Sequence, residues 1–169
     1  MIAITIDDRE VLAALGRLRV RVGNMKPAME EIGEHLTETT KRRFETSTAP
    51  DGSSWASNAQ ATILAHLGIH KGNFTKSGKI SAKGAGRAMS KRPLIGESRS
   101  LMSTIHYNAG SQSVEIGSPM KYAAMQQFGG SKASFPHLWG DIPARPFLGF
   151  SDDDQRSIIE LISRYLSTP

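Results

Sequence analysis

The segment from residue 142 to residue 151, Ile-Pro-Ala-Arg-Pro-Phe-Leu-Gly-Phe-Ser, most restricts how this chain can fold. Its prolines, Pro143 and Pro146, fix φ at about −65° and favour extended backbone in the residue before each of them. Phe147, Leu148 and Phe150 follow within a few positions, and burying each large apolar side chain is worth roughly 1.5–3 kcal/mol. We therefore expect a stiff, nearly straight strap that pins the C-terminal part of the chain onto a sheet or a neighbouring subunit, rather than the wall of a catalytic pocket.

The polar residues of the strap predict how it is held. Arg145 stands between the two prolines, and its planar guanidinium suits a carboxylate, a row of carbonyl oxygens or a phosphate. Ser151 and the three aspartates after it are typical of an N-cap and the acidic first turn of a helix. The apolar residues that follow predict a last helix over residues 152–166.

Apolar periodicity predicts the other elements. Alternation of Ile2, Ile4 and Ile6 indicates a short N-terminal strand. Further helices are expected over residues 9–22, 27–45, 56–67 and 119–128, and a β-hairpin is expected from strands near Ile105–Tyr107 and Val114–Ile116. The first helix carries one apolar stripe at helical spacing, formed by Leu12, Leu15, Leu18 and Val22.

Several large side chains are expected to anchor these elements. Trp55 follows a Pro-Asp-Gly turn, and a tryptophan in that place usually docks on the body of the protein. The full set of expected anchors is Trp55, Tyr122, Phe128, Pro143 and Pro146. The basic residues Lys41, Arg42 and Arg43 close the 27–45 helix, where they suit the negative end of its dipole; a phosphate contact is the alternative.

The positive charge of the chain is concentrated in one segment, residues 71–93. The formal net charge is +5, yet the other 14 of the 21 basic residues and all 16 acidic residues lie outside this segment, which leaves the rest of the chain at −2. The basic residues of the segment are Lys71, Lys76, Lys79, Lys83, Arg87, Lys91 and Arg92. Its glycine, serine and lysine content predicts a long mobile loop or insertion. Such a loop is either a DNA-facing arm that binds through salt-dependent contacts or a solvated insertion.

No pattern of catalytic or cofactor-binding residues stands out. The chain has no cysteine, and its glycines do not form a phosphate-binding motif. His66 and His70 are four residues apart, but no adjacent carboxylate in the sequence supplies a third ligand, so we expect solvent-facing histidines and no metal. We expect no catalytic residue and no cofactor, and therefore not an enzyme.

The loop from Ser131 to Asp141 is more apolar than the loop of a monomer should be. Its Phe-Pro-His-Leu-Trp run suggests contact with another chain, and folding of the loop back onto the body is the alternative. The residues expected at a subunit or partner interface are Phe135, Leu138, Trp139, Arg145 and Phe147.

These features together predict a single α+β domain over residues 1–169. A small antiparallel sheet should pack against several helices, interrupted by the basic loop at residues 71–93. At 169 residues, one domain buries around two-thirds of its unfolded surface. No segment has the roughly 18–20 apolar residues that span a bilayer, and no secretory leader precedes the first strand, so we expect no membrane contact and a cytoplasmic product.

The order of the motifs resembles a known family. The motifs are Arg43–Phe44, Pro50–Gly52 with Trp55, Leu94 with Ser100–Leu101, Val114–Gly117, Tyr122–Ala123, Gln127–Gly130 and Ile142–Gly149. This order is similar to that of the phage virion morphogenesis, or tail completion, proteins of contractile-tailed phages and Mu-like prophages. Residues 125–127 read Met-Gln-Gln where a histidine close before the Gln-Phe-Gly motif is expected.

The resemblance implies a structural assembly protein. Such a protein completes the tail and helps to join it to the filled head, and its partners are other tail or neck proteins. The resemblance also implies a homo-oligomeric ring, of about six subunits, whose contacts close by rotation. The expected location is the host bacterial cytoplasm during assembly and then the virion. A nucleic-acid-binding module that uses residues 71–92 is the alternative function.

Overall fold

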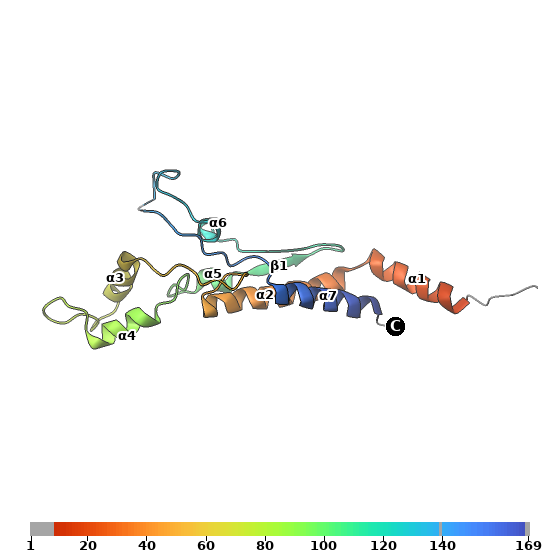
Figure 1. Ribbon diagram of the computed structural model, residues 1–169, viewed down its shortest axis with the longest axis horizontal. Helices are drawn as coiled ribbons and strands as arrows, with labels where there is room; N and C mark the ends of the chain where they lie inside the picture. The colour runs from red at the N-terminus through yellow and green to blue at the C-terminus, as the bar shows by residue number, and fades with distance from the viewer. Residues whose placement is uncertain (1–8, 139, 168–169) are drawn as a thin grey trace, which may run out of the picture.

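The computed structural model describes residues 9–138 and 140–167, which form seven helices and one two-stranded sheet. The elements are α1 (Arg9–Gly23), α2 (Lys26–Thr46), α3 (Gln60–Gly68), α4 (Ala82–Ser90), α5 (Ser100–Ser103), β1 (His106–Ala109), β2 (Val114–Gly117), α6 (Ala123–Phe128) and α7 (Asp152–Ser167). The molecule is elongated, with α1 at one end and α3 and α4 at the other (Figure 1). The predicted class, a single α+β domain, is confirmed. The strand predicted at residues 2–6 and the side chain of Trp139 lie outside the described residues.

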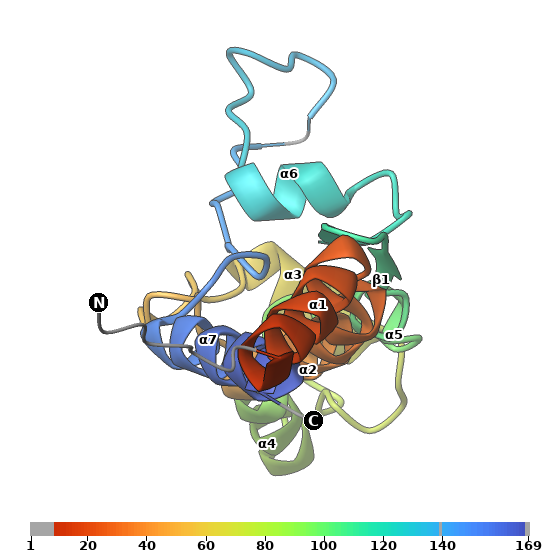
Figure 2. The ribbon, with the colours of Figure 1, turned by 90° about the vertical axis from the view of Figure 1, so that its right-hand side faces the viewer.

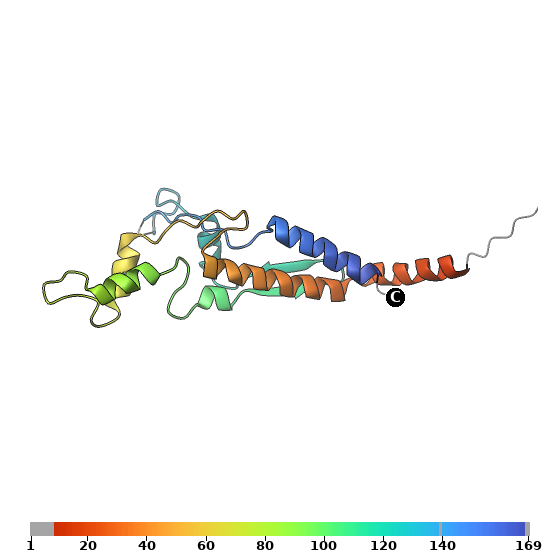
Figure 3. The ribbon, with the colours of Figure 1, turned by 60° about the horizontal axis from the view of Figure 1, so that its bottom comes forward.

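Helix α2 is the spine of the fold. It begins with Pro27 in its first turn, where the missing N–H of proline costs nothing, and its inward face includes Ala28, Ile32 and Leu36. The hairpin of β1 and β2 packs on α2, and α7 runs alongside α2 (Figure 3). Gly33 permits the close approach of the hairpin, since a Cβ at this position would lie 2.3 Å from the ring of Tyr107.

The hairpin has the predicted strands. β1 and β2 are antiparallel, with Tyr107 opposite Ile116 and Ala109 opposite Val114. The turn between them contains a hydrogen bond from Gly110 N to Ser113 O of 2.8 Å. The sheet is confined to this pair in the part of the chain that the structure describes, so the fold depends on helices packed around it.

The aromatic core joins α2, the turn after it and the strap. Phe44 and Phe147 are completely buried, and Trp55 is 7% exposed. The Phe44 ring lies 5.4 Å from the Trp55 ring, nearly perpendicular to it, and 5.3 Å from the Phe147 ring. Edge-to-face pairs of this kind add about 0.5–1.5 kcal/mol to the burial of the rings. Trp55 therefore packs in this core against Phe44.

A buried ion pair fixes the strap between α2 and α7. Arg43 donates through Nη1 to the carbonyl oxygens of Phe147, at 3.0 Å, and Gly149, at 2.9 Å. Its Nη2 donates to Asp154, in the first turn of α7. Arg43 is 7% exposed and Asp154 is 1% exposed. Arg43 lies in the last turn of α2, the place predicted from the sequence to suit the negative end of the helix dipole. Its donors are used inside the fold, so they are not available to a phosphate.

Ser151 and Asp154 form the predicted N-cap of α7. Ser151 Oγ accepts from Asp154 N at 3.1 Å, and Asp154 Oδ2 accepts from Ser151 N at 2.8 Å. Burial alone raises the pKa of the Asp154 carboxyl, but hydrogen bonds from Ser151 and Thr39 and the charge of Arg43 outweigh burial. The pKa of Asp154 therefore lies below its ordinary value of 3.8.

Two expectations about secondary structure and burial are wrong. Residues 82–90, expected in a loop, form α4, because Ser81 caps the helix and Gly84 lets it approach the carbonyl of Asn73. Phe150, expected to be buried, is 59% exposed, since the chain turns at Gly149, whose φ is 144°. The mobility of the basic segment stays a prediction.

The buried pair leads to a prediction on stability. Replacing Asp154 by Asn leaves Arg43 buried without its counter-charge, and we expect the free energy of unfolding to fall by about 3–5 kcal/mol. The wild-type carboxyl, whose pKa is lowered on folding, contributes stability that is complete above pH 3.8 and is lost as the pH falls through the lower folded pKa. Urea unfolding of both proteins between pH 3 and pH 7, about the range in which carboxylates titrate, measures both effects.

Asp153 provides the matched control. Its side chain is 86% exposed and pairs on the surface with Arg156, so Asp153→Asn should change stability by less than about 0.5 kcal/mol. Equal losses in the two variants would contradict the role given to Asp154.

Candidate functional site

The strap is bound along its length by α6. Gln127 Oε1 accepts from the backbone N–H groups of Phe147, at 2.9 Å, and Leu148, at 3.0 Å, and its Nε2 donates to Leu148 O at 3.0 Å. Arg145 N donates to Gln126 O at 2.8 Å. The amide of Gln127 thus replaces a strand partner for the strap, a role that sequence reasoning missed.

Arg145 is the second buried arginine that holds the strap. Its Nε donates to Ala56 O at 2.8 Å and its Nη2 donates to Ser57 O at 2.9 Å. Of the three kinds of partner considered from the sequence, Arg145 therefore binds the row of carbonyl oxygens. Trp55 Nε1 donates to Pro146 O at 2.8 Å from the same side. Burial without an acidic partner lowers the pKa of Arg145 from its ordinary value. The side chains of Arg145 and Phe147, both expected at an interface, are buried within the chain.

A loop of residues 131–141 projects from the point where α6 meets the strap (Figure 2). Gly130 and Ile142 close its base with two backbone hydrogen bonds of 2.9 and 2.8 Å. Asp141 Oδ1 accepts from Lys132 N at 2.7 Å just above this base. The two ends of the loop are therefore joined by hydrogen bonds, and the loop extends outward from the strap and α6.

Apolar side chains gather on this loop and on α6. Phe135 is 40% exposed, and its ring lies near Gly130, where an added Cβ would meet it at 3.2 Å. Phe128 is 79% exposed and Tyr122 is 45% exposed, so the expectation that they anchor the fold is wrong. Tyr122 precedes the first residue of the short helix α6 and Phe128 is its last residue, while Ala123 is the buried residue of this helix. We call Tyr122, Phe128, Phe135 and Leu138 the apolar surface.

The basic segment lies at the opposite end from α1, around α3 and α4 (Figure 1). The side chains of Lys71, Lys76, Lys79 and Lys83 are exposed. Arg92 donates to Glu45 O and Lys91 to Ile95 O, so these two cations also have roles inside the fold. The segment is tied to α3 by Asn73, fully buried, whose Nδ2 donates to Leu67 O at 2.8 Å.

Two surface cavities flank the segment 91–97. One, of about 420 Å³, lies between this segment and the strap and includes Leu94, Ile142 and Arg145 in its lining. The other, of about 610 Å³, is lined by the cations Lys91, Arg92 and Arg99 and by His66 and Glu97. The cationic lining favours anions in the second cavity.

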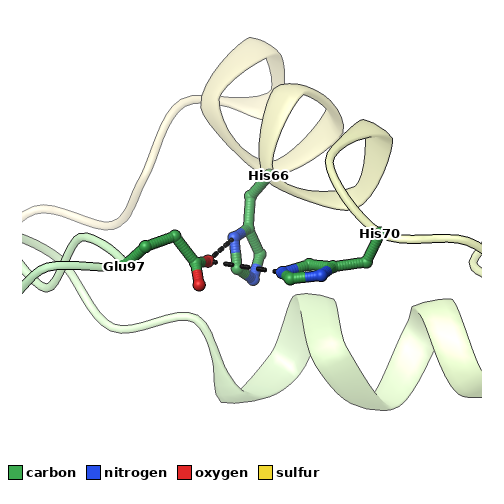
Figure 4. Close-up of side chains that lie close together, drawn as sticks. All are labelled: His66, His70 and Glu97. Atoms are coloured by element: carbon green, nitrogen blue, oxygen red, sulfur yellow. Dashed lines mark ion pairs between the residues drawn. The ribbon is translucent and has the colours of Figure 1, made fainter.

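The two histidines of α3 and its C-terminal end have an acidic neighbour that the sequence analysis did not find. Glu97 Oε1 lies 3.1 Å from His66 Nδ1 and 3.5 Å from His70 Nε2 (Figure 4). Glu97 therefore supplies a carboxylate that no residue adjacent in the sequence provides. Glu97 is 27 residues beyond His70 in the chain, and no local spacing indicates the contact.

Comparison with known proteins gives the family. Residues 6–167 match the model of the phage virion morphogenesis family, which is nearly the whole chain. The chain belongs to this family. It is 26% identical to Mu-like prophage FluMu G protein 2 of Haemophilus influenzae over 98% of this chain and 96% of that protein. It is 27% identical to tail completion protein S of Escherichia phage P2 over 80% of each chain. No solved structure matches significantly.

The geometry gives a physical meaning to the motifs that carry the family resemblance. The Gln-Phe-Gly-Gly motif at residues 127–130 binds the strap through Gln127 and Gly130. Arg43, Phe44 and Trp55 contact the strap from the other side. These motifs of this family member therefore converge on one structure, the strap with its projecting loop. No helix in the described part of the chain combines the length and apolar character needed to cross a membrane.

Gln127 allows a direct test of how the strap is held. Gln127→Ala removes three hydrogen bonds and leaves two backbone N–H groups of the strap without a partner, so we expect a loss of about 1–3 kcal/mol in the free energy of unfolding. Gln126→Ala is the matched control, since Gln126 holds the strap through its backbone carbonyl. Chemical denaturation of both variants measures the difference, and equal stabilities would contradict this role of Gln127.

Proposed function

We propose that this protein is a structural subunit of phage assembly that acts in tail completion and in joining the tail to the head. The family of the chain and the name of its P2 relative, tail completion protein S, support this role. We further propose that it works as a ring, of about six copies, at the tail end or neck. In this view it is not an enzyme, and it acts by binding and by shape.

The apolar surface carries this proposal. Phe128 and Phe135 expose large rings on an element that stands out from the body of the chain (Figure 2). Large apolar side chains exposed on a projecting element are consistent with a protein–protein contact. The strap, with Arg145 and Phe147 buried beneath it, holds this element in place. Phe135, Leu138 and Trp139 therefore remain the proposed contact residues, and Arg145 and Phe147 are proposed to position them.

Helix α1 supports an assembly role in a second way. Its apolar stripe, Leu12, Leu15, Leu18 and Val22, is 40–58% exposed along the whole helix. The last turn of α1 is held to α7, where the guanidinium of Arg21 lies 5.6 Å from the centre of the Tyr165 ring. The remainder extends beyond the body of the chain (Figure 1). We propose that a second copy or another tail or neck protein covers this stripe, first in the host cytoplasm and then in the virion.

The apolar surface gives a direct functional prediction. The double variant Phe128→Ser, Phe135→Ser should remain folded, because Phe128 is 79% exposed and Phe135 is 40% exposed, yet it should fail to complement a phage that lacks this gene. Electron microscopy of lysates should then show separate heads and tails. Met89→Ser, an 89% exposed change on α4, is the control and should complement fully.

The oligomeric state gives an independent test of the ring. Light scattering of purified protein at increasing concentration, alone and with isolated tails, should show self-association or tail binding that the double variant loses. A protein that stays monomeric and does not bind isolated tails would contradict the proposal.

A second candidate function is non-specific DNA binding by the basic segment. The four exposed lysines, Lys71, Lys76, Lys79 and Lys83, favour it, because they lie within one segment that contains no acidic residue. A head–tail joint lies next to the packaged DNA, so the two functions are compatible.

The salt dependence of DNA affinity distinguishes a basic segment that binds DNA from one that only faces solvent. If the segment binds duplex DNA, each phosphate contact contributes about −0.9 to the slope of log K against log salt. Reversing Lys76 and Lys79 to Glu should then reduce the slope and the affinity in a fluorescence anisotropy titration. Binding that is unchanged by the reversal, or absent at low salt, would reject this function. Reversal of Lys121 and Lys132, exposed outside the segment, is the control.

A further inference from the structure

We propose that His66, His70 and Glu97 form a binding site for one divalent transition-metal ion, with Zn²⁺ as the ion that suits the ligands best. The three ligand atoms, two imidazole nitrogens and one carboxylate oxygen, lie within 4.8 Å of one another. The inference is independent of the role in tail completion, because it rests on these three side chains alone.

The distances suit direct coordination. Zinc bonds of about 2.0–2.2 Å at tetrahedral angles place neighbouring ligand atoms roughly 3.3–3.5 Å apart. Glu97 Oε1 lies 3.1 Å from His66 Nδ1 and 3.5 Å from His70 Nε2. The imidazole rings of the two histidines are 5.9 Å apart and nearly perpendicular, so both edges face the same region (Figure 4). The two imidazole nitrogens lie within 4.8 Å of each other, so small rotations of the partly exposed His70 ring and of the exposed Glu97 side chain bring the three atoms to coordination distances.

The chemistry of the donor set selects the class of metal. Imidazole nitrogen binds Zn²⁺, Ni²⁺ and Co²⁺ well, whereas Ca²⁺ and Mg²⁺ prefer oxygen ligands throughout. Two histidines and one glutamate are three protein ligands, which leaves a fourth position for water. The negative charge of Glu97 favours a bound cation, although Lys91, Arg92 and Arg99 line the same cavity as His66 and Glu97 and weaken the binding of any cation.

The position of the ligands indicates what the metal does. His66 and His70 lie immediately before the basic segment 71–93, and Glu97 lies shortly after it. A metal ion bound by all three therefore closes this segment at its base and fixes α3 to the segment that leads into α5. Such a clip stabilises the end of the molecule that carries α3 and α4 through the constraint on the enclosed loop.

Isothermal titration of full-length, tag-free and metal-stripped protein with ZnCl₂ tests the proposal. One equivalent should bind the wild type, and Co²⁺ should give the visible absorption of a low-symmetry site. His70→Gln and Glu97→Gln, both partly or largely exposed positions, should weaken Zn²⁺ binding by more than the roughly 10–100-fold cost of losing a second-shell partner. His137→Gln and Glu115→Gln, also exposed, are the matched controls and should bind like the wild type.

Limited trypsin digestion gives a readout of the clip itself. The segment 71–93 contains seven Lys and Arg residues, six of which are trypsin cleavage positions because Pro93 follows Arg92. Zn²⁺ should slow cleavage there in the wild type and in the control variants but not in His70→Gln. Circular dichroism of the variants checks that they are folded. Zinc binding that is absent, or that has the same affinity in His70→Gln and Glu97→Gln as in the wild type, would overturn the proposal.

Discussion

The guanidinium of Arg43 connects parts of the chain that are far apart in the sequence. From the last turns of α2 it binds the carbonyl oxygens of Phe147 and Gly149 and the carboxylate of Asp154. A buried charge requires a partner and full hydrogen bonding, so this arrangement allows few alternatives for the path of the strap. With the strap fixed on α2, the start of α7 and the base of the projecting loop are also fixed.

The outward-facing features follow from this constraint. Gln127 binds the strap to α6, and Arg145 binds it to residues 56–57. Phe128 and Tyr122 then remain outside, and the loop of residues 131–141 leaves the body as a closed unit. Around the strap, the chain therefore uses Arg43, Arg145 and Gln127 inside the fold and leaves the rings of Phe128 and Tyr122 exposed.

Sequence reasoning predicted the parts that depend on local physics. Helical periodicity gave α1, α2 and α7, alternation gave the hairpin, and the Ser151 cap and the docking of Trp55 followed from short motifs. Sequence reasoning failed where contacts between residues far apart in the sequence determine the structure. The low apolar content of residues 82–90 concealed α4, which is stabilised by packing of Gly84 on Asn73. Glu97, near the histidines only in space, could not be found from spacing.

The central claim is that the loop held by the strap contacts another protein when the tail is completed. A photo-crosslinking amino acid at Ser134, an exposed position in this loop, tests it in phage particles assembled in vivo. We expect crosslinks from position 134 to a second copy or to a tail or neck protein, and few from a control position such as Lys76 in the basic segment. Crosslinks confined to the chain itself, in particles that are complete, would contradict it.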